Sequence, residues 1–426
     1  MEISDLYRIF TEYPVICTDS RNIIPDSIFF ALKGNNFDGN KYVEQALLKG
    51  CAYAVSDDIS NAELDGCIVV ENVLQTLSEL AKYHRNSLNV HVLAITGTNG
   101  KTTTKELVGA VLSKRYKTVC TMGNQNNHIG VPLSLLSMPA DTEIAVIETG
   151  ANHCGEIAAL CEIACPNSGI ITNIGKAHIE GFGSAEGVRK AKSELYNYLE
   201  KHRGTIFYNS DDETLTTMAE KTSNTVLVPY GAKAMDVETA SGTFLAFGAN
   251  RLSLNVQTSL VGEYNLNNAL AAVAVGLYFD VSVEDIADAL AAFKPENNRS
   301  QLIETSKNTV IMDAYNANPS SMEAALTNFA KLDKPNKLLI LGDMLELGTE
   351  AHSEHKKIIE LTQKLGFENI IFVGSNFYEL KDKSISIHFS DSIEARKYLS
   401  NNNISVHTIL VKGSRGIGLE KLLAEL

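Results

Sequence analysis

A glycine-rich loop at residues 97–102 contains the residue types that bind nucleotide phosphates. It lies within VLAITGTNGKTTTKEL, residues 92–107. The commonest phosphate loop has the pattern G-x-x-x-x-G-K-[ST], which would need a glycine where this chain has Ile95. The first glycine is instead Gly97, in a shortened T-G-T-N-G-K-T. Backbone N–H groups of such a loop attract phosphate oxygens, and Lys101 would add its positive charge. We therefore predict a nucleotide-binding loop of a shorter kind.

Residues near this loop could also hold Mg²⁺. The ion prefers oxygen ligands and usually takes a carboxylate besides a hydroxyl and phosphates. The Thr102 hydroxyl has the position that reaches the ion in phosphate loops. Glu148 supplies a carboxylate directly after the apolar run Ala-Val-Ile, and His178 is a second candidate ligand. Because a lone histidine is more often structural, the residues alone favour Glu148.

A lysine borders the apolar side of a predicted helix. The segment SAEGVRKAKSELYNYLEKH, residues 184–202, has an apolar stripe of Val188, Ala191, Leu195 and Leu199, and Lys192 lies beside it. Burial favours the neutral amine, which can add CO₂ to become a carbamate, an anion able to ligate a metal. From the residues alone, a lysine that extends its ammonium to solvent is the commoner arrangement.

The segments that must position these residues alternate between strands and helices. We expect strands in VHVLAIT (90–96), EIAVIETG (143–150) and SGIITNIG (168–175), with a helix over 101–116. This alternation predicts a mostly parallel, doubly wound α/β sheet. Ligands bind such sheets at the carboxyl ends of the strands, where Glu148 and His178 fall.

Two further α/β units flank this sheet in sequence. Short strands and helices precede residue 89, and a third unit follows residue 297 with strands in NTVIMD, KLLILG, NIIFVG, ISIHFS and HTILVKG. We expect three domains, residues 1–89, 90–297 and 298–426.

Composition limits the possible classes of function. With 37 Lys and Arg against 51 Asp and Glu, the formal charge is −14, which argues against non-specific nucleic-acid binding. We find no signal peptide and no apolar run long enough to span a membrane. The seven cysteines indicate reduced thiols, so we expect a cytoplasmic protein. We interpret Cys154, Cys161 and Cys165 as buried small apolar residues, because their spacing matches no zinc site.

Taken together, these motifs resemble the Mur ligases, ATP-dependent amide-forming enzymes of peptidoglycan precursor synthesis. TGTNGKT is that family's form of the phosphate loop, and the likeness runs through nearly the whole chain. It implies a three-domain α/β architecture: an N-terminal domain that binds the UDP-sugar-peptide, a central ATP-binding domain with a P-loop-type sheet, and a Rossmann-like C-terminal domain that closes on ATP and the incoming amine.

The resemblance also implies roles for individual residues. In TDSRNIIPDSIFFALKG and GNQNNHIG, it implies substrate contacts by Ser20, Arg21, Lys33, Asn126 and Asn127. It makes Thr102, Glu148, His178 and a carbamylated Lys192 ligands of two Mg²⁺ ions. Arg299 would meet the ATP phosphates, although the family usually has a glycine where this chain has Asn298. The implied ATP-binding residues are Gly97, Thr98, Asn99, Gly100, Lys101, Thr102, Thr103, Asn265, Asn268, Arg299 and Asp313. Lys101, Lys192, His178 and Arg299 would act in catalysis.

Within the family, the chain resembles the branch that adds D-alanyl-D-alanine to UDP-N-acetylmuramoyl-tripeptide. DAYNANPSSM, with Asn316 and Asn318 as substrate contacts, and LGDMLELG are typical of that branch. The string D-N-P-R, which marks the ligase of the preceding step, is absent from the sequence. The implied reaction passes through an acyl phosphate and supports cell-wall growth, shape and division. We expect a monomer.

Two alternatives remain at this point. A folylpolyglutamate synthetase shares the loop and the chemistry, and a nucleotide-binding switch would share the loop alone. The sequence does not distinguish meso-diaminopimelate from lysine as the third residue of the tripeptide.

Overall fold

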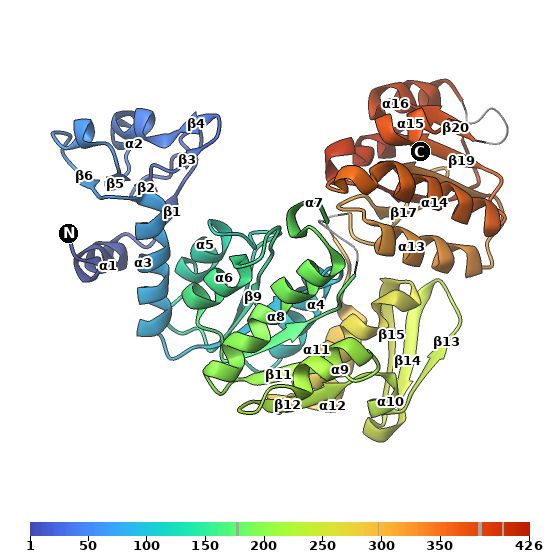
Figure 1. Cartoon of the computed structure of the whole chain (residues 1–426), viewed down its shortest axis with the longest axis horizontal. Coiled ribbons are helices and arrows are strands. Elements are labelled where there is room, and N and C mark those ends of the chain that lie inside the picture. Colours follow the sequence, from blue (N-terminus) through green and yellow to red (C-terminus); the bar gives the residue numbers. More distant parts are fainter. Residues whose placement is uncertain (176–178, 297, 382–385, 403) are drawn as a thin grey trace.

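The computed structural model describes residues 1–175, 179–296, 298–381, 386–402 and 404–426. These residues form three α/β bodies that follow one another along the chain (Figure 1). The N-terminal body lies at one end of the molecule, and the C-terminal body lies at the other. Each body has its own main β-sheet with helices packed against it. The predicted α/β class and three-part architecture are therefore confirmed.

The N-terminal body contains a four-stranded parallel sheet in the order β1-β2-β5-β6. Strand β2 lies inside this sheet, and its residues IFF are buried, as expected for a strand covered on both faces. Helix α3 packs against α1 and also against α5 and α6 of the central body, so it joins the two bodies. The elements are α1 Ile3–Glu12, β1 Ile16–Cys17, β2 Ile28–Phe30, β3 Lys33–Gly34, β4 Phe37–Asp38, η1 Gly39–Tyr42, α2 Val43–Leu48, β5 Tyr53–Ser56, η2 Ile59–Asn61, β6 Cys67–Val69 and α3 Val73–Ser87.

The central body contains a six-stranded parallel sheet in the order β12-β11-β10-β7-β9-β8. The chain leaves β7 toward one edge of the sheet for β8 and β9, and it crosses to the other side for β10. Ligands bind at such a reversal, just beyond the carboxyl ends of the strands. The elements are β7 His91–Thr96, α4 Lys101–Leu112, β8 Thr118–Cys120, α5 Gly130–Leu136, β9 Ile144–Glu148, α6 Glu156–Ala164, β10 Ser168–Ile171, α7 Ile179–Phe182, α8 Ala185–Lys201, β11 Thr205–Asn209, α9 Glu213–Glu220 and β12 Val226–Tyr230.

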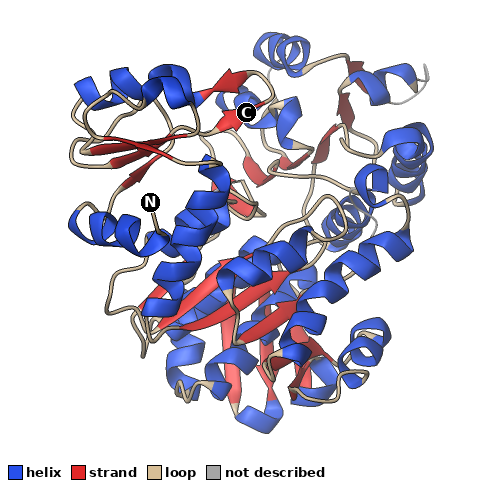
Figure 2. Ribbon diagram, turned by 60° about the vertical axis from the view of Figure 1, so that its left-hand side comes forward, coloured by secondary structure: helices blue, strands red, loops and turns tan. Residues whose placement is uncertain are grey.

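Helices cover both faces of the central sheet (Figure 2). Leu93 and Ile95 of β7 pack into a core with α4 and α11, whereas Val92 and Ala94 point to the other face, toward helices such as α5 and α8. Successive side chains of a strand point to opposite faces, so the unbroken apolar run VLAI is explained by burial on both sides. This rigid centre holds the start of the phosphate loop.

A three-stranded antiparallel sheet, β13-β14-β15, extends the central body. This sheet was not among the elements expected from the sequence. In β15, Leu254, Val256, Thr258 and Leu260 are buried in alternation with more exposed residues, as expected for a sheet with one covered face. The elements are α10 Ala232–Met235, β13 Val237–Ala240, β14 Phe244–Ala249, η3 Asn250–Leu252, β15 Leu254–Val261, η4 Glu263–Asn265, α11 Leu266–Tyr278 and α12 Val283–Ala292.

The C-terminal body contains a six-stranded sheet in the order β16-β17-β21-β18-β19-β20, in which only β16 is antiparallel. The carboxyl ends of β17 and β21 lie side by side, with Asp313 paired to Lys412. The elements are β16 Gln301–Glu304, β17 Thr309–Asp313, α13 Pro319–Lys331, β18 Lys337–Gly342, η5 Gly348–Glu350, α14 Ala351–Lys364, β19 Ile370–Val373, α15 Ser375–Glu379, β20 Ile387–Phe389, α16 Ser392–Asn401, β21 Thr408–Lys412, η6 Arg415–Ile417 and η7 Leu419–Glu425.

The fold bears on two predictions, the lack of a membrane-spanning helix and the burial of three cysteines. No helix among the described residues is both long and apolar enough to cross a membrane. All seven cysteines are free thiols; Cys161 is buried as expected, whereas Cys165 is only partly buried. Cys154 is exposed, so its predicted burial was wrong. It lies in the loop before α6, outside the apolar face that buries Cys161.

Candidate active site

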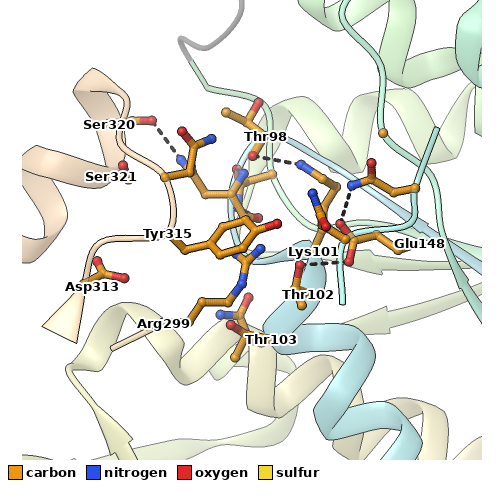
Figure 3. A pocket seen from close by; sticks show the side chains of 18 of the residues that line it. Thr98, Lys101, Thr102, Thr103, Glu148, Arg299, Asp313, Tyr315, Ser320 and Ser321 are labelled. Atoms are coloured by element: carbon orange, nitrogen blue, oxygen red, sulfur yellow. Dashed lines mark hydrogen bonds between the residues drawn. The ribbon is translucent and has the colours of Figure 1, made fainter. Parts of the chain in front are cut away.

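A cleft of about 550 Å³ lies between the central and C-terminal bodies (Figure 3). The phosphate loop and Glu148 form one side of it, and residues of the C-terminal body such as Ser320 and Ser321 form the other. Among the predicted site residues, the cleft is lined by Thr98, Asn99, Gly100, Lys101, Thr102, Thr103, Asn126, Asn127, Glu148, Asn265, Asn268, Arg299, Asp313 and Asn316. These residues, up to 218 positions apart in sequence from Thr98 to Asn316, therefore share one cavity.

The phosphate loop follows β7 directly and continues into α4. Gly97 has φ 140° and Gly100 has φ 78°, values that L side chains rarely adopt. A Cβ on Gly97 would lie 2.0 Å from Oγ1 of Thr172, and one on Gly100 would lie 2.4 Å from Oδ1 of Asn268. Both positions therefore require glycine, and the predicted strand–loop–helix geometry is present.

Lys101 folds back onto its own loop. Its Nζ donates hydrogen bonds to the carbonyl oxygens of Gly97 at 2.9 Å and Thr98 at 3.2 Å. Desolvation lowers the pKa of Lys101, the charge of Glu148 opposes that effect, and the charge of Arg299 adds to it. An ammonium held by two carbonyls beside the helix start is in place to meet a phosphate.

Glu148 is held between two polar side chains from different segments. Its Oε2 accepts a hydrogen bond of 2.8 Å from Oγ1 of Thr102, and its Oε1 accepts one of 2.7 Å from Nδ2 of Asn126. Its exposed fraction is 1%, and no described lysine or arginine lies within ion-pair distance. A buried carboxylate with no described lysine or arginine in contact carries a desolvation cost that a bound metal ion would offset.

This arrangement fits Mg²⁺ as bound in phosphate loops. Among the described residues, no three side chains of His, Cys, Asp or Glu gather into a metal cluster. A hydroxyl and one carboxylate, completed by phosphate oxygens and water, is nonetheless a sufficient ligand set for this ion. The second predicted ligand, His178, lies outside the described residues.

Asn265 and Asn268, both predicted to bind ATP, are buried beside the phosphate loop. Nδ2 of Asn268 donates to Oδ1 of Asn265 at 2.9 Å, and Oγ1 of Thr104 donates to Oδ1 of Asn268 at 3.1 Å. Nδ2 of Asn265 donates to the carbonyl of Val261 at 2.9 Å. The amides are thereby oriented by the chain itself.

The C-terminal body contributes charges and an aromatic ring. Cζ of Arg299 lies 3.7 Å from the centre of the Tyr315 ring, a close cation–π contact (Figure 3). Asp313 forms a 2.6 Å ion pair with Lys412, and the Lys412 side chain is 3% exposed. Oδ1 of Asp313 also accepts a hydrogen bond of 3.1 Å from the N–H of Ser300. Parallel pairing of β17 with β21 brings this pair together.

Lys192 lies on α8, outside the lining of the cleft, and is 2% exposed. The four stripe residues beside it are buried as predicted, whereas Arg189 and Lys190 are exposed. Burial, with a smaller effect of the Lys101 charge, lowers the pKa of Lys192 to about 7. Nζ lies 5.6 Å from the centre of the Phe182 ring, and no described carboxylate is within ion-pair distance. The expectation of a solvent-reaching lysine was therefore wrong.

The predicted UDP contacts lie in the N-terminal body, away from this cleft. Arg21 donates from Nε and Nη2 to the two carboxylate oxygens of Asp19, both at 2.9 Å. Lys33 forms a 2.8 Å ion pair with Asp57, and Ser20 is buried. Gly97 and Asn318 do not line the cleft either.

Several lining residues were not predicted, among them Tyr264, Ser300, Tyr315, Ser320, Ser321 and Lys412. Their position at or just beyond strand ends was a usable signal for Tyr315 and Lys412, since VIMDAYNANP and TILVKGSRG both end a strand with polar residues. The serines gave no such signal, because their role depends on where α13 begins.

Comparison with known proteins gives consistent matches over the chain. Models of the Mur ligase family match residues 12–96 (catalytic domain), 95–276 (middle domain) and 298–415 (glutamate ligase domain). The chain is 35% identical to UDP-N-acetylmuramoyl-tripeptide–D-alanyl-D-alanine ligase of Bacillus subtilis (strain 168), over 96% of this chain and 92% of that protein.

Solved structures agree with the sequence matches. A crystal structure of MurF from Acinetobacter baumannii has a TM-score of 0.87 at 31% identity and covers 100% of this chain and 98% of that one. The MurF ligase from Thermotoga maritima, in complex with ADP, has a TM-score of 0.84 at 26% identity, with 96% of each chain covered.

Proposed function

The chain belongs to the Mur ligase family, and on that premise we infer that it is an ATP-dependent ligase adding D-alanyl-D-alanine to UDP-N-acetylmuramoyl-tripeptide. The reaction releases ADP and phosphate and serves peptidoglycan precursor synthesis. The observation that carries the assignment is the shared cleft, in which the phosphate loop and Glu148 face the YNANP segment of the C-terminal body. An amide ligase must hold ATP and two substrates at one place, and this cleft joins segments suited to both tasks.

ATP is bound across the two sides of the cleft. Residues 97–103 surround the phosphates, and Lys101 leaves the Gly97 and Thr98 carbonyls to neutralise phosphate charge. Asn265 and Asn268 contact the adenine, and Asp313 binds the ribose. Arg299, which stacks on Tyr315, turns to the phosphates.

Thr102 and Glu148, whose hydroxyl and carboxylate are 2.8 Å apart, would hold Mg²⁺, which would supply positive charge to the phosphates. His178 and the Lys192 carbamate would be the ligands of a second ion.

Lys192 is carbamylated in the active enzyme. Its pKa of about 7 leaves a large share of the amine neutral near neutral pH. The nitrogen lone pair attacks the carbon of CO₂, the N–C bond forms, and the ammonium proton is lost to solvent. The product is an anion, and no described carboxylate lies within ion-pair distance of Nζ. Burial of a charged lysine is costly, and the carbamate would give this buried lysine a function.

The acceptor substrates occupy the remaining sites. Ser20, Arg21 and Lys33 bind the uridine diphosphate, and Asn126 and Asn127 contact the muramoyl part. Asn316 lies on the dipeptide side, next to Lys412, whose Nζ donates to its carbonyl at 3.3 Å. Asn126 also donates to Glu148, so the muramoyl contact and the carboxylate share one hydrogen-bonded unit.

The reaction has two chemical steps. The terminal carboxylate of the tripeptide attacks the γ-phosphorus of ATP, the bond to the β-phosphate oxygen breaks, and ADP leaves. Lys101 and Arg299 stabilise the charge on the transferring oxygens. The neutral amine of D-alanyl-D-alanine then attacks the carbonyl carbon of the acyl phosphate, its nitrogen gives up a proton, and the tetrahedral intermediate expels phosphate to leave the amide. The C-terminal body covers the acyl phosphate and excludes water.

The domain ranges 1–89, 90–297 and 298–426 correspond to UDP-substrate binding, ATP binding and closure. The enzyme works as a cytoplasmic monomer. The N-terminal UDP-binding segment and the YNANP string favour this function over a folylpolyglutamate synthetase, and the four-part set of loop, Glu148, His178 and Lys192 favours it over a nucleotide switch.

The test is product analysis. Incubation with ATP, the nucleotide tripeptide and D-alanyl-D-alanine should give a nucleotide product heavier by one dipeptide less one water. Folate substrates in place of the nucleotide should give none.

A further inference from the structure

The N-terminal end of α13 is hydrogen-bonded to the phosphate loop. Nδ2 of Asn318 donates to Oδ1 of Asn99 at 2.7 Å, and Nδ2 of Asn99 donates to Oγ of Ser320 at 2.9 Å. Oγ of Ser320 in turn donates to Oδ1 of Asn318 at 3.0 Å. The three side chains close a ring of hydrogen bonds, and two of its bonds join residues 219 and 221 positions apart in sequence.

Asn99 is also fixed from the central body through its main chain. Its N–H donates to Oδ1 of Asn173 at 3.0 Å, and its carbonyl accepts from Oγ1 of Thr172 at 2.6 Å and from Nδ2 of Asn173 at 2.9 Å. The loop residue is therefore held by the end of β10 on one side and by α13 on the other. The approach of α13 is close: a Cβ on Gly175 would lie 3.0 Å from Oγ of Ser320.

The orientation of the Asn318 amide is determined by α13 itself. Oδ1 of Asn318 accepts from the N–H of Ser321 at 2.9 Å, and Oγ of Ser321 accepts from the N–H of Asn318 at 3.1 Å, which is a capping box. Because the cap uses the amide oxygen, the amide nitrogen must point to Asn99. Asn318 is 5% exposed, so its side chain has little freedom to turn toward a substrate.

We propose that Asn99, Asn318 and Ser320 form a latch through which the docked C-terminal body holds the phosphate loop in its working conformation. Asn318 and Ser320 are then positioning residues that act through Asn99. The latch segment begins directly after Tyr315 and Asn316, which line the cleft, so the chain that meets the dipeptide also steadies the loop that meets ATP. The inference rests on the proposed function.

A latch predicts a specific loss of coupling between ATP use and amide formation. When the C-terminal body no longer holds the loop, the body also covers the cleft less well, and water reaches the acyl phosphate. We expect Ser320→Ala, which removes two bonds of the ring and leaves the α13 cap in place, to slow amide formation by about tenfold. The amide formed per phosphate released should fall by about twofold or more.

The experiment measures amide and phosphate together for wild type, Ser320→Ala, Asn99→Ala and the double variant. Asn99→Ala, which also alters the phosphate loop, should be at least as slow as Ser320→Ala, and the double variant should be no slower than Asn99→Ala, because all three variants lose one coupled unit. Ser400→Ala, a surface serine of α16 in the same body whose Oγ donates only to the Lys397 carbonyl, is the control for loss of a serine. Thermal unfolding of each variant identifies any that fails to fold.

Two results would overturn the latch. One is a wild-type ratio of amide to phosphate in Ser320→Ala, even if both rates fall, because a merely structural role lowers both equally. The other is a double variant whose loss equals the product of the single losses, since the effects of independent residues multiply. Dipeptide-dependent phosphate release by the wild type separates these outcomes from a failure of the proposed function.

Discussion

The hydroxyl of Thr102 donates a 2.8 Å hydrogen bond to the carboxylate of Glu148, although 46 positions separate the two residues in sequence. The sheet accounts for this contact. Strand β9 pairs with β7 so that Glu148 lies opposite Ile95, two residues before the phosphate loop. Parallel pairing thus brings the carboxylate level with the first turn of α4, where the hydroxyl lies.

Replacing Glu148 by glutamine should slow ligation by roughly 10²–10³-fold. The substitution keeps the size of the side chain and an acceptor for the Thr102 hydroxyl but removes the charge that holds Mg²⁺. Ligation rates measured over a range of Mg²⁺ concentrations check this. Glu143→Gln, an exposed residue just before the same strand, is the matched control. A Glu148→Gln enzyme within twofold of wild type at equal Mg²⁺ would exclude Glu148 as a ligand.

Replacing Lys101 by methionine should cost on the order of 10²–10³-fold in kcat. The apolar chain keeps most of the volume but loses the ammonium that stabilises the transferring phosphoryl group. The measurement is single-turnover ligation with ATP saturating. Lys114→Met, an exposed position just after α4, should remain active. Near-full ligation by Lys101→Met would contradict the proposed role of the loop.

Lys192→Ala should lose most activity and recover part of it when a short-chain carboxylic acid is added. The acid would supply the negative group that the carbamate provides in the wild type. The independent readout is a carbamate carbon signal in NMR spectra of enzyme equilibrated with ¹³CO₂, present in wild type and absent in Lys192→Ala. Lys190→Ala, on the exposed face of the same helix, should keep both the signal and the activity. Unimpaired activity of Lys192→Ala would remove the carbamate from the mechanism.

The depressed pKa of Lys192 also predicts a pH dependence of stability. The group releases its proton near pH 7 when folded, against 10.5 for an ordinary lysine. Between these values the unfolded chain binds more protons, so stability rises with pH. Lys192→Met lacks this dependence. Its free energy of unfolding should exceed that of wild type most below about pH 7, and the difference should shrink as the pH approaches 10.

Urea unfolding in CO₂-free buffers at about pH 6.5, 8 and 9.5 measures this difference. The absence of CO₂ keeps the amine free of carbamate. A difference between wild type and Lys192→Met that stays constant over this range would show that Lys192 titrates normally in the folded chain.

The local parts of the site were predictable from the sequence. The apolar run before the loop predicted a strand over residues 90–96 and a helix from 101, and β7 and α4 occupy 91–96 and 101–112. An apolar strand followed by two glycines is a strong local pattern, because the backbone conformation and close neighbours of Gly97 and Gly100 leave no room for a side chain. The burial of Lys192 was less predictable. An apolar stripe shows which face of a helix packs inward, but it does not show whether a residue at the edge of that face is exposed to solvent.

The contacts between distant segments were not predictable. Asp313 and Lys412 form their ion pair because β17 lies next to β21, and strand order cannot be read from the two segments alone. The bond between Asn99 and Asn318 depends on how the C-terminal body docks, which no local pattern encodes. The antiparallel sheet β13–β15 was missed because alternating burial in LNVQTSLV is a weak signal beside the apolar runs of parallel strands.

The most direct test of the central claim is phosphate release from ATP by the purified protein with UDP-N-acetylmuramoyl-tripeptide, with and without D-alanyl-D-alanine. Both forms of the tripeptide, with meso-diaminopimelate or with lysine, should be supplied, and the nucleotide product should be weighed by mass spectrometry. We predict release that requires the dipeptide and equals the amount of amide formed. Release that is indifferent to the dipeptide, or product of unchanged mass, would contradict the assignment.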